Sequence, residues 1–159
     1  RLKTAVLIAC ALKSGAIMAD ASAKDAETLY RFGINIGLAF QLQDDWLDVY
    51  GDTKTFGKKI GGDILCNKKT FLLVNAMKLA SPTVKAELME WLSKEDAVDE
   101  EKIKAVTAIY DKLKINELTK GRIRMFYDEA MLNFSQLSLP DEQASVLLDV
   151  TGKLINRQV

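Results

Sequence analysis

Three aspartates within five residues form the part of this sequence best suited to chemistry. Asp44, Asp45 and Asp48 follow Gln41 at spacings of three, four and seven residues. On an α-helix these spacings place all four side chains along one stripe. Residues 34–50 contain no lysine or arginine that could balance the three negative charges. Because clustered like charges repel one another and oxygen ligands suit a hard divalent cation, the stripe predicts a metal site.

The positions around the stripe do not fit a calcium-binding loop and favour magnesium as the ion. Counted from Asp44, the third position of a calcium-binding EF-hand loop would be Trp46, and the sixth, which requires glycine, would be Val49. Magnesium fits better, since it uses one or two carboxylates and completes its shell with water and phosphate oxygens. The alternative is an ordinary solvated acidic face of an amphipathic helix, although such a face normally carries mixed charge.

The segment that follows supplies positive charge. Residues 51–70 contain two aspartates, Asp52 and Asp63, and five lysines, Lys54, Lys58, Lys59, Lys68 and Lys69. Lysine ammonium groups act as compact charges for phosphate oxygens, and the glycines of this segment allow close approach of the backbone. Alone, the segment would be interpreted as a surface loop. Together with the acidic stripe, it favours a metal-bridged diphosphate site.

The composition excludes several classes of function. Lysine plus arginine and aspartate plus glutamate number 22 each, which argues against bulk electrostatic capture of nucleic acid or an anionic membrane. The chain has no histidine, so histidine-ligated zinc and a Ser-His-Asp triad are excluded. Cys10 and Cys66 match no metal-ligand spacing and are expected to be reduced thiols in a cytoplasmic protein. The apolar runs are shorter than the roughly 18–20 residues that a membrane span requires.

The hydrophobic periodicity predicts an all-α fold. The uncharged stretch Thr4–Leu12 is expected to be enclosed by other helices. Ser22 and Asp25 have the spacing of a capping box, and Ser81-Pro82 is typical of a helix start. Residues 51–67 are expected to form a loop, and residues 93–99 a charged turn. The expected helices cover residues 2–20, 24–50, 68–79, 81–92, 100–114, 116–137 and 138–156.

The order of these motifs resembles a known family. Phe40, Gln41, Asp44, Asp45 and Asp48 fill every fixed position of a pattern similar to the second aspartate-rich motif of the trans-isoprenyl diphosphate synthases, or polyprenyl synthetases. Further similar groups are Lys3-Thr4, Phe56-Gly57-Lys58, Gly62-Asp63 and Asn67-Lys68-Lys69-Thr70. The resemblance is strong over residues 2–73, and the remainder agrees in helical character only.

The resemblance implies the C-terminal part of the isoprenoid synthase helical bundle, with residues 1–159 forming part of a single domain. In that family, two facing aspartate-rich motifs hold Mg2+ on the diphosphate of an allylic substrate. Pyrophosphate leaves, the double bond of isopentenyl diphosphate attacks the allylic cation, and loss of a proton gives a longer trans-prenyl diphosphate. The family also suggests a homodimer.

The resemblance assigns roles to individual residues. Asp44 and Asp48 are expected to bind magnesium, with Asp45 at the metal or directly behind it. The residues expected to contact the allylic diphosphate are Lys3, Lys58 and Lys68. Thr4 and Gln41 are expected to line the cavity near the developing cation, and Asp63 to hold the loop in place.

Two departures from the family pattern limit this interpretation. The first aspartate-rich motif and the basic residues that bind isopentenyl diphosphate are missing, and in the family they precede the position of Arg1. We therefore expect a C-terminal half that is inactive alone, with its N-terminal half missing. The alternatives are a non-catalytic regulatory subunit, which usually loses the aspartates kept here, and a generic helical scaffold. Terpene cyclases and squalene-type synthases have different metal motifs.

Overall fold

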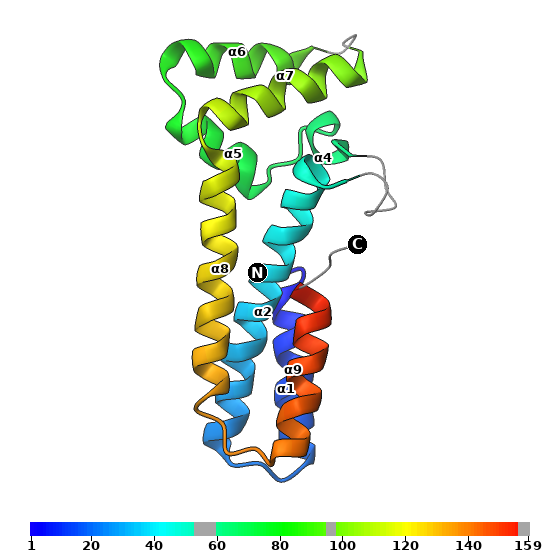
Figure 1. Ribbon diagram of the computed structural model, residues 1–159, viewed down its shortest axis with the longest axis vertical. Coiled ribbons are helices and arrows are strands. Elements are labelled where there is room, and N and C mark those ends of the chain that lie inside the picture. The colour runs from blue at the N-terminus through cyan, green and yellow to red at the C-terminus, as the bar shows by residue number, and fades with distance from the viewer. Residues whose placement is uncertain (53–59, 95–97, 156–159) are drawn as a thin grey trace. The chain divides into compact units, whose positions relative to one another are not determined.

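A computed structural model describes residues 1–52, 60–94 and 98–155 (Figure 1). Within these ranges every regular element is a helix, which confirms the predicted all-α fold. None of the described helices is long and apolar enough to cross a bilayer. The helices are α1 (Ala5–Met18), α2 (Ala23–Tyr50), α4 (Gly62–Leu65), α5 (Phe71–Leu79), α6 (Pro82–Ser93), α7 (Asp99–Lys112), α8 (Ile115–Phe134) and α9 (Asp141–Ile155).

The chain divides into two compact units. The first comprises Arg1–Gln43 and the described residues from Arg122 onward, and the second comprises Asp44–Gly121. Helices α2 and α8 each contribute residues to both units. The predicted site residues are therefore divided as well, with Gln41 in the first unit and the three aspartates of the stripe in the second.

Side-chain caps begin several helices where the sequence predicts. The Ser22 hydroxyl accepts the backbone N–H of Asp25 at 3.0 Å and donates to its carboxylate at 2.7 Å. Ser81 accepts the backbone N–H of Val84 at 3.4 Å, with Pro82 as the first helical residue. Because a capped start supplies acceptors to otherwise unpaired amides, α2 and α6 begin within a residue of their expected positions.

Other boundaries differ from the prediction. Residues 51–67 contain the short helix α4, which no periodicity indicates because it spans only four residues. Gly61 precedes it with φ of 88°, a left-handed conformation that favours glycine. Helix α5 begins at Phe71 instead of residue 68, because Thr70 caps it by accepting the Leu73 N–H at 3.3 Å. Part of the expected charged turn, residues 95–97, lies outside the described residues.

The core of the first unit forms where α1, α9 and the parts of α2 and α8 that belong to it pack together (Figure 1). Phe32 and Ile36 of α2 are buried against Ala130 of α8, and the Phe32 and Phe134 rings lie 6.0 Å apart. The expectation that the whole stretch Thr4–Leu12 is enclosed is wrong for this chain, since Leu7 is 72% exposed.

The second unit has its own core. Fully buried side chains from four helices meet there, and α6 and α7 lie side by side (Figure 1). These side chains are Leu72, Leu88, Val106 and Ile115. Val49 of α2 belongs to the same cluster, so the last two turns of α2 are anchored in the second unit by apolar packing.

A seam of small residues joins α1 to α2 in the first unit. Ala5 and Ala9 are fully buried and face Gly37 and Gly33. A Cβ atom added at Gly37 would lie 2.5 Å from the Cα of Ala5, and one added at Gly33 would lie 2.6 Å from the Cα of Ala9. Both distances are too short for real atoms, so the two backbones approach closely only because these positions are glycine.

Replacing Gly37 by alanine should therefore destabilise the protein. The gain in helix propensity is at most about 1 kcal/mol, whereas overpacking against a backbone costs about 1–3 kcal/mol. We expect a net loss of about 1–2 kcal/mol in the free energy of unfolding, measured by urea denaturation. Gly15→Ala in α1 is the matched control, because nothing lies within 4 Å of its added Cβ. It should gain about 0.5–1 kcal/mol, and equal effects of the two changes would show that the seam does not limit the packing.

Candidate functional site

Lys68 lies between two carboxylates of the second unit. Its ammonium nitrogen is 3.2 Å from Asp45 Oδ1 and 2.6 Å from Asp63 Oδ2. The side chain of Asp45 is only 9% exposed, so its charge depends on a nearby partner. Burial lowers the pKa of Lys68, but the hydrogen bonds and charges of the two carboxylates outweigh it and raise the pKa above its ordinary value. Lys68 therefore stays protonated and supplies a positive charge at the stripe.

Asp48 fixes the segment that carries these partners. Its Oδ2 accepts the backbone N–H of Asp63 at 2.8 Å, and its backbone carbonyl accepts the N–H of Gly61 at 2.6 Å. Burial raises the pKa of Asp48, the bond from Asp63 opposes this, and the charges of Asp63 and Asp44 raise the pKa further. The net rise means that the folded protein disfavours the charged form of Asp48. The charge of the nearby Lys68 ammonium lowers this pKa but does not offset the effect of burial.

Asp63 connects Asp48 to Lys68. Besides the ion pair, its backbone carbonyl accepts the backbone N–H of Lys68 at 2.9 Å. Asp63 is therefore bonded to Asp48 on one side and to Lys68 on the other, contacts that agree with the loop-holding role expected for it. The second unit brings together Asp45, Asp48, Asp63 and Lys68 in one network.

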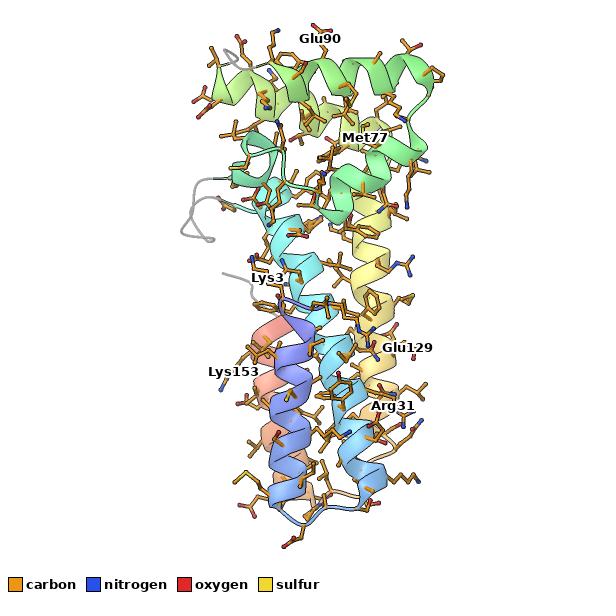
Figure 2. All side chains as sticks on the ribbon, turned by 180° about the vertical axis from the view of Figure 1, so that it is seen from behind. Lys3, Arg31, Met77, Glu90, Glu129 and Lys153 are labelled. Carbon is orange, nitrogen blue, oxygen red and sulfur yellow. The ribbon has the colours of Figure 1, made fainter. Side chains whose placement is uncertain are left out.

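Two further predicted site residues meet in the first unit. The Thr4 hydroxyl donates to Gln41 Oε1 at 2.7 Å, across the interface between α2 and the residue preceding α1. Gln41 is one helical turn beyond Gly37, so the small-residue seam leads directly to this bond. Lys3, labelled in Figure 2, is exposed and directly precedes Thr4 in the chain. Lys58 lies outside the described residues.

The donor chemistry of the stripe fits magnesium only as an incomplete shell. In the described part of the chain, no group of three or more aspartate, glutamate, cysteine or histidine side chains converges closely enough to hold an ion alone. Asp44, Asp45 and Asp48 offer only oxygen ligands, and two of them already have donors as partners. Magnesium is commonly bound by one or two carboxylates with phosphate and water completing the octahedron. Their roles as ligands stay predictions.

The sequence analysis missed one group of residues beside the stripe. The indole N–H of Trp46 donates to Asn116 Oδ1 at 2.9 Å, and the Tyr50 hydroxyl donates to Asp111 Oδ1 at 3.0 Å. These bonds join positions 61 to 70 residues apart, which no local spacing indicates. The available signal was the pair of aromatic residues one turn apart, directly next to the aspartates.

Comparison with known proteins identifies similar chains. The polyprenyl synthetase family profile matches residues 1–110. A short chain isoprenyl diphosphate synthase of Methanocaldococcus jannaschii is 41% identical over 101 residues, which are 64% of this chain and 31% of that protein. Component 2 of the heptaprenyl diphosphate synthase of Bacillus subtilis is 34% identical over 138 residues, covering 77% of this chain and 39% of that protein.

A solved structure is similar over nearly the whole chain. It is the geranylgeranyl pyrophosphate synthase of Corynebacterium glutamicum, complexed with isoprenyl diphosphate and magnesium. Its TM-score is 0.88 at 31% identity, and the match covers 99% of this chain and 45% of that one. The chain thus spans less than half the length of each of these three proteins.

The geometry at Asp48 predicts opposite effects on stability and on metal binding. Asp48→Asn keeps an oxygen to accept the Asp63 N–H and removes a charge that the folded state disfavours. When folding raises the pKa of an aspartate, its charge destabilises the folded state at pH values above that pKa, and this cost disappears below the ordinary pKa. The variant lacks the charge, so it should be at least as stable as the wild type at neutral pH. Any advantage should vanish on acidification through the ordinary aspartate range.

Thermal denaturation between pH 3 and 8 measures the stability, and calorimetric titration with MgCl2 and pyrophosphate measures the binding. We expect the metal-dependent binding of Asp48→Asn to weaken. A variant that is much less stable at neutral pH, with unchanged binding, would mean that Asp48 serves only as a cap for α4.

Proposed function

Because the chain belongs to the polyprenyl synthetase family, we propose that the intact protein is a prenyltransferase that joins isopentenyl diphosphate to an allylic diphosphate. The products are a longer trans-prenyl diphosphate and pyrophosphate. The observation that carries the proposal is the position of the Lys68 ammonium, 3.2 Å from Asp45 in the stripe that resembles the second aspartate-rich motif. A cation for phosphate oxygens and carboxylates for a divalent ion are thereby adjacent.

The reaction builds up negative charge on the diphosphate that leaves the allylic substrate. The bond between the allylic carbon and the diphosphate oxygen breaks, and its electron pair leaves with pyrophosphate. The double bond of isopentenyl diphosphate then forms the new carbon–carbon bond, and a proton leaves the adjacent carbon. Negative charge grows on the diphosphate as the first bond breaks, so positive groups held in place stabilise the transition state.

Different residues of this chain would stabilise the leaving diphosphate and the allylic cation. Asp44, Asp45 and Asp48 would hold magnesium, which supplies positive charge to the diphosphate when bound. Lys68 of the second unit would contact a phosphate oxygen, and the family pattern assigns the same role to Lys3 and Lys58. Thr4 and Gln41, hydrogen-bonded to each other, would present their oxygen atoms near the developing allylic cation.

A non-catalytic regulatory subunit is the weaker alternative. Component 2 of the Bacillus subtilis synthase is by its name part of a multi-component enzyme, so an assembly of different chains has a precedent among the relatives. Retention of all three aspartates favours the catalytic role. We propose a homodimer of the intact protein, and light scattering coupled to gel filtration tests it. A monomer that becomes active only with a different chain would overturn it.

Removing one metal ligand should abolish most of the turnover of the intact enzyme. Asp44→Ala removes charge stabilisation worth several kcal/mol, so kcat should fall by roughly a hundredfold or more. The measurement is incorporation of labelled isopentenyl diphosphate with saturating allylic diphosphate and MgCl2. Asp141→Ala, an exposed change in the first turn of α9, is the control and should affect stability by no more than about 1 kcal/mol. Equal losses of turnover would remove any special role for Asp44.

A further inference from the structure

An aromatic cluster lies on the second-unit part of α2, beside the aspartates. The Trp46 and Tyr50 rings stack with centroids 5.8 Å apart and an interplanar angle of 27°. The Trp46 indole N–H donates to Asn116 in the first turn of α8 at 2.9 Å. The Lys120 ammonium, one turn further along α8, lies 4.8 Å from the centroid of a Trp46 ring. Trp46 is thus held by a directional bond at its edge and a cation at its face.

Tyr50 extends the contact to the neighbouring helix. Its hydroxyl donates to Asp111 in the last turn of α7 at 3.0 Å. Burial and this bond raise the pKa of Tyr50, so the hydroxyl keeps the proton that it donates. Together, Trp46 and Tyr50 connect the last two turns of α2 to the corner between α7 and α8 through three polar contacts.

The cluster and the acidic stripe occupy opposite sides of one helix. Successive residues of an α-helix are turned by about 100°, so positions two apart are turned by about 200°. Trp46 lies two residues after Asp44 and two before Asp48, and Tyr50 lies two after Asp48. A contact that fixes the direction of the two rings therefore also fixes the direction in which the carboxylates point.

We propose that Trp46 is a positioning residue, whose bond to Asn116 sets the rotation of this part of α2 and thereby aims Asp44 and Asp48. The inference rests on the proposed function, in which those carboxylates hold magnesium. Magnesium demands near-ideal octahedral geometry, and a binding constellation tolerates errors of only about 10–20° in its groups. The apolar packing of Val49 does not specify such an angle, whereas hydrogen bonds are directional. The bonds of Asp45 and Asp48 engage the carboxylates themselves, and the bond of Trp46 orients the helix from its other side.

The test compares Trp46 with Trp91 in the intact protein. Trp46→Phe keeps an aromatic ring and loses the N–H donor. Trp91→Phe is the matched control, because Trp91 lies on α6 of the same unit and also has a lysine, Lys94, over its ring at 4.5 Å. Calorimetry measures binding of inorganic pyrophosphate with MgCl2 and with NaCl alone. Trp46→Phe should weaken the magnesium-dependent binding by about three- to tenfold, as expected for loss of one hydrogen bond, and Trp91→Phe by less than twofold.

A second variant separates positioning from folding. Asn116→Ala breaks the same bond from the other side, so it should weaken magnesium-dependent binding as Trp46→Phe does. The double variant should be no worse than either single change. If Trp46→Phe does not fold, Asn116→Ala still tests the role of this bond. Thermal denaturation of each variant reports stability separately, and binding without magnesium should be unchanged in all of them.

The outcomes distinguish this inference from the proposed function. If the wild type binds pyrophosphate equally with and without magnesium, the metal site and the inference both fail. If the wild type depends on magnesium and Trp46→Phe or Asn116→Ala matches it, only the positioning role fails. Lower thermal stability with unchanged magnesium-dependent affinity would likewise overturn the inference, since it would assign Trp46 to structure alone.

Discussion

The repulsion among Asp44, Asp45 and Asp48 is the interaction around which the second unit is organised. Three carboxylates within five residues on one helix need nearby donors or cations. The chain supplies them from a single segment, since α4 and the residues after it bring the Asp63 N–H to Asp48 and the Lys68 ammonium to Asp45. Burial keeps the pKa of Asp48 raised, although the charge of Lys68 lowers it. Two of the three carboxylates thus have donors within their own unit.

In the first unit, the constraint is the short distance between the backbones of α1 and α2. The buried pairs Ala5–Gly37 and Ala9–Gly33 let the backbones of α1 and α2 approach closely. The Thr4–Gln41 bond lies at the end of this seam and requires the same close approach. The two units therefore position their polar groups in different ways. In the second unit, donors and a cation compensate the carboxylates, and in the first unit, glycines allow two helices to approach closely.

The sequence predicts the features that depend on neighbouring residues. The helical class, the caps at Ser22 and Ser81 and the carboxylate stripe all follow from spacings of three or four residues. Helix α4 escapes prediction because four residues are too few to display a period. The pairing of Trp46 with Asn116 escapes it because 70 residues separate them and only tertiary packing brings them together.

The two ion pairs of Lys68 have a consequence for the entropy of binding the proposed diphosphate. A free surface lysine samples many rotamers and loses about 1.5–2 kcal/mol of side-chain entropy when it is immobilised. Lys68 is already confined between Asp45 and Asp63, yet its own side chain is 45% exposed. An anion that reaches the exposed part of the ammonium would therefore meet a side chain that is already ordered. The two carboxylates preorganise the lysine.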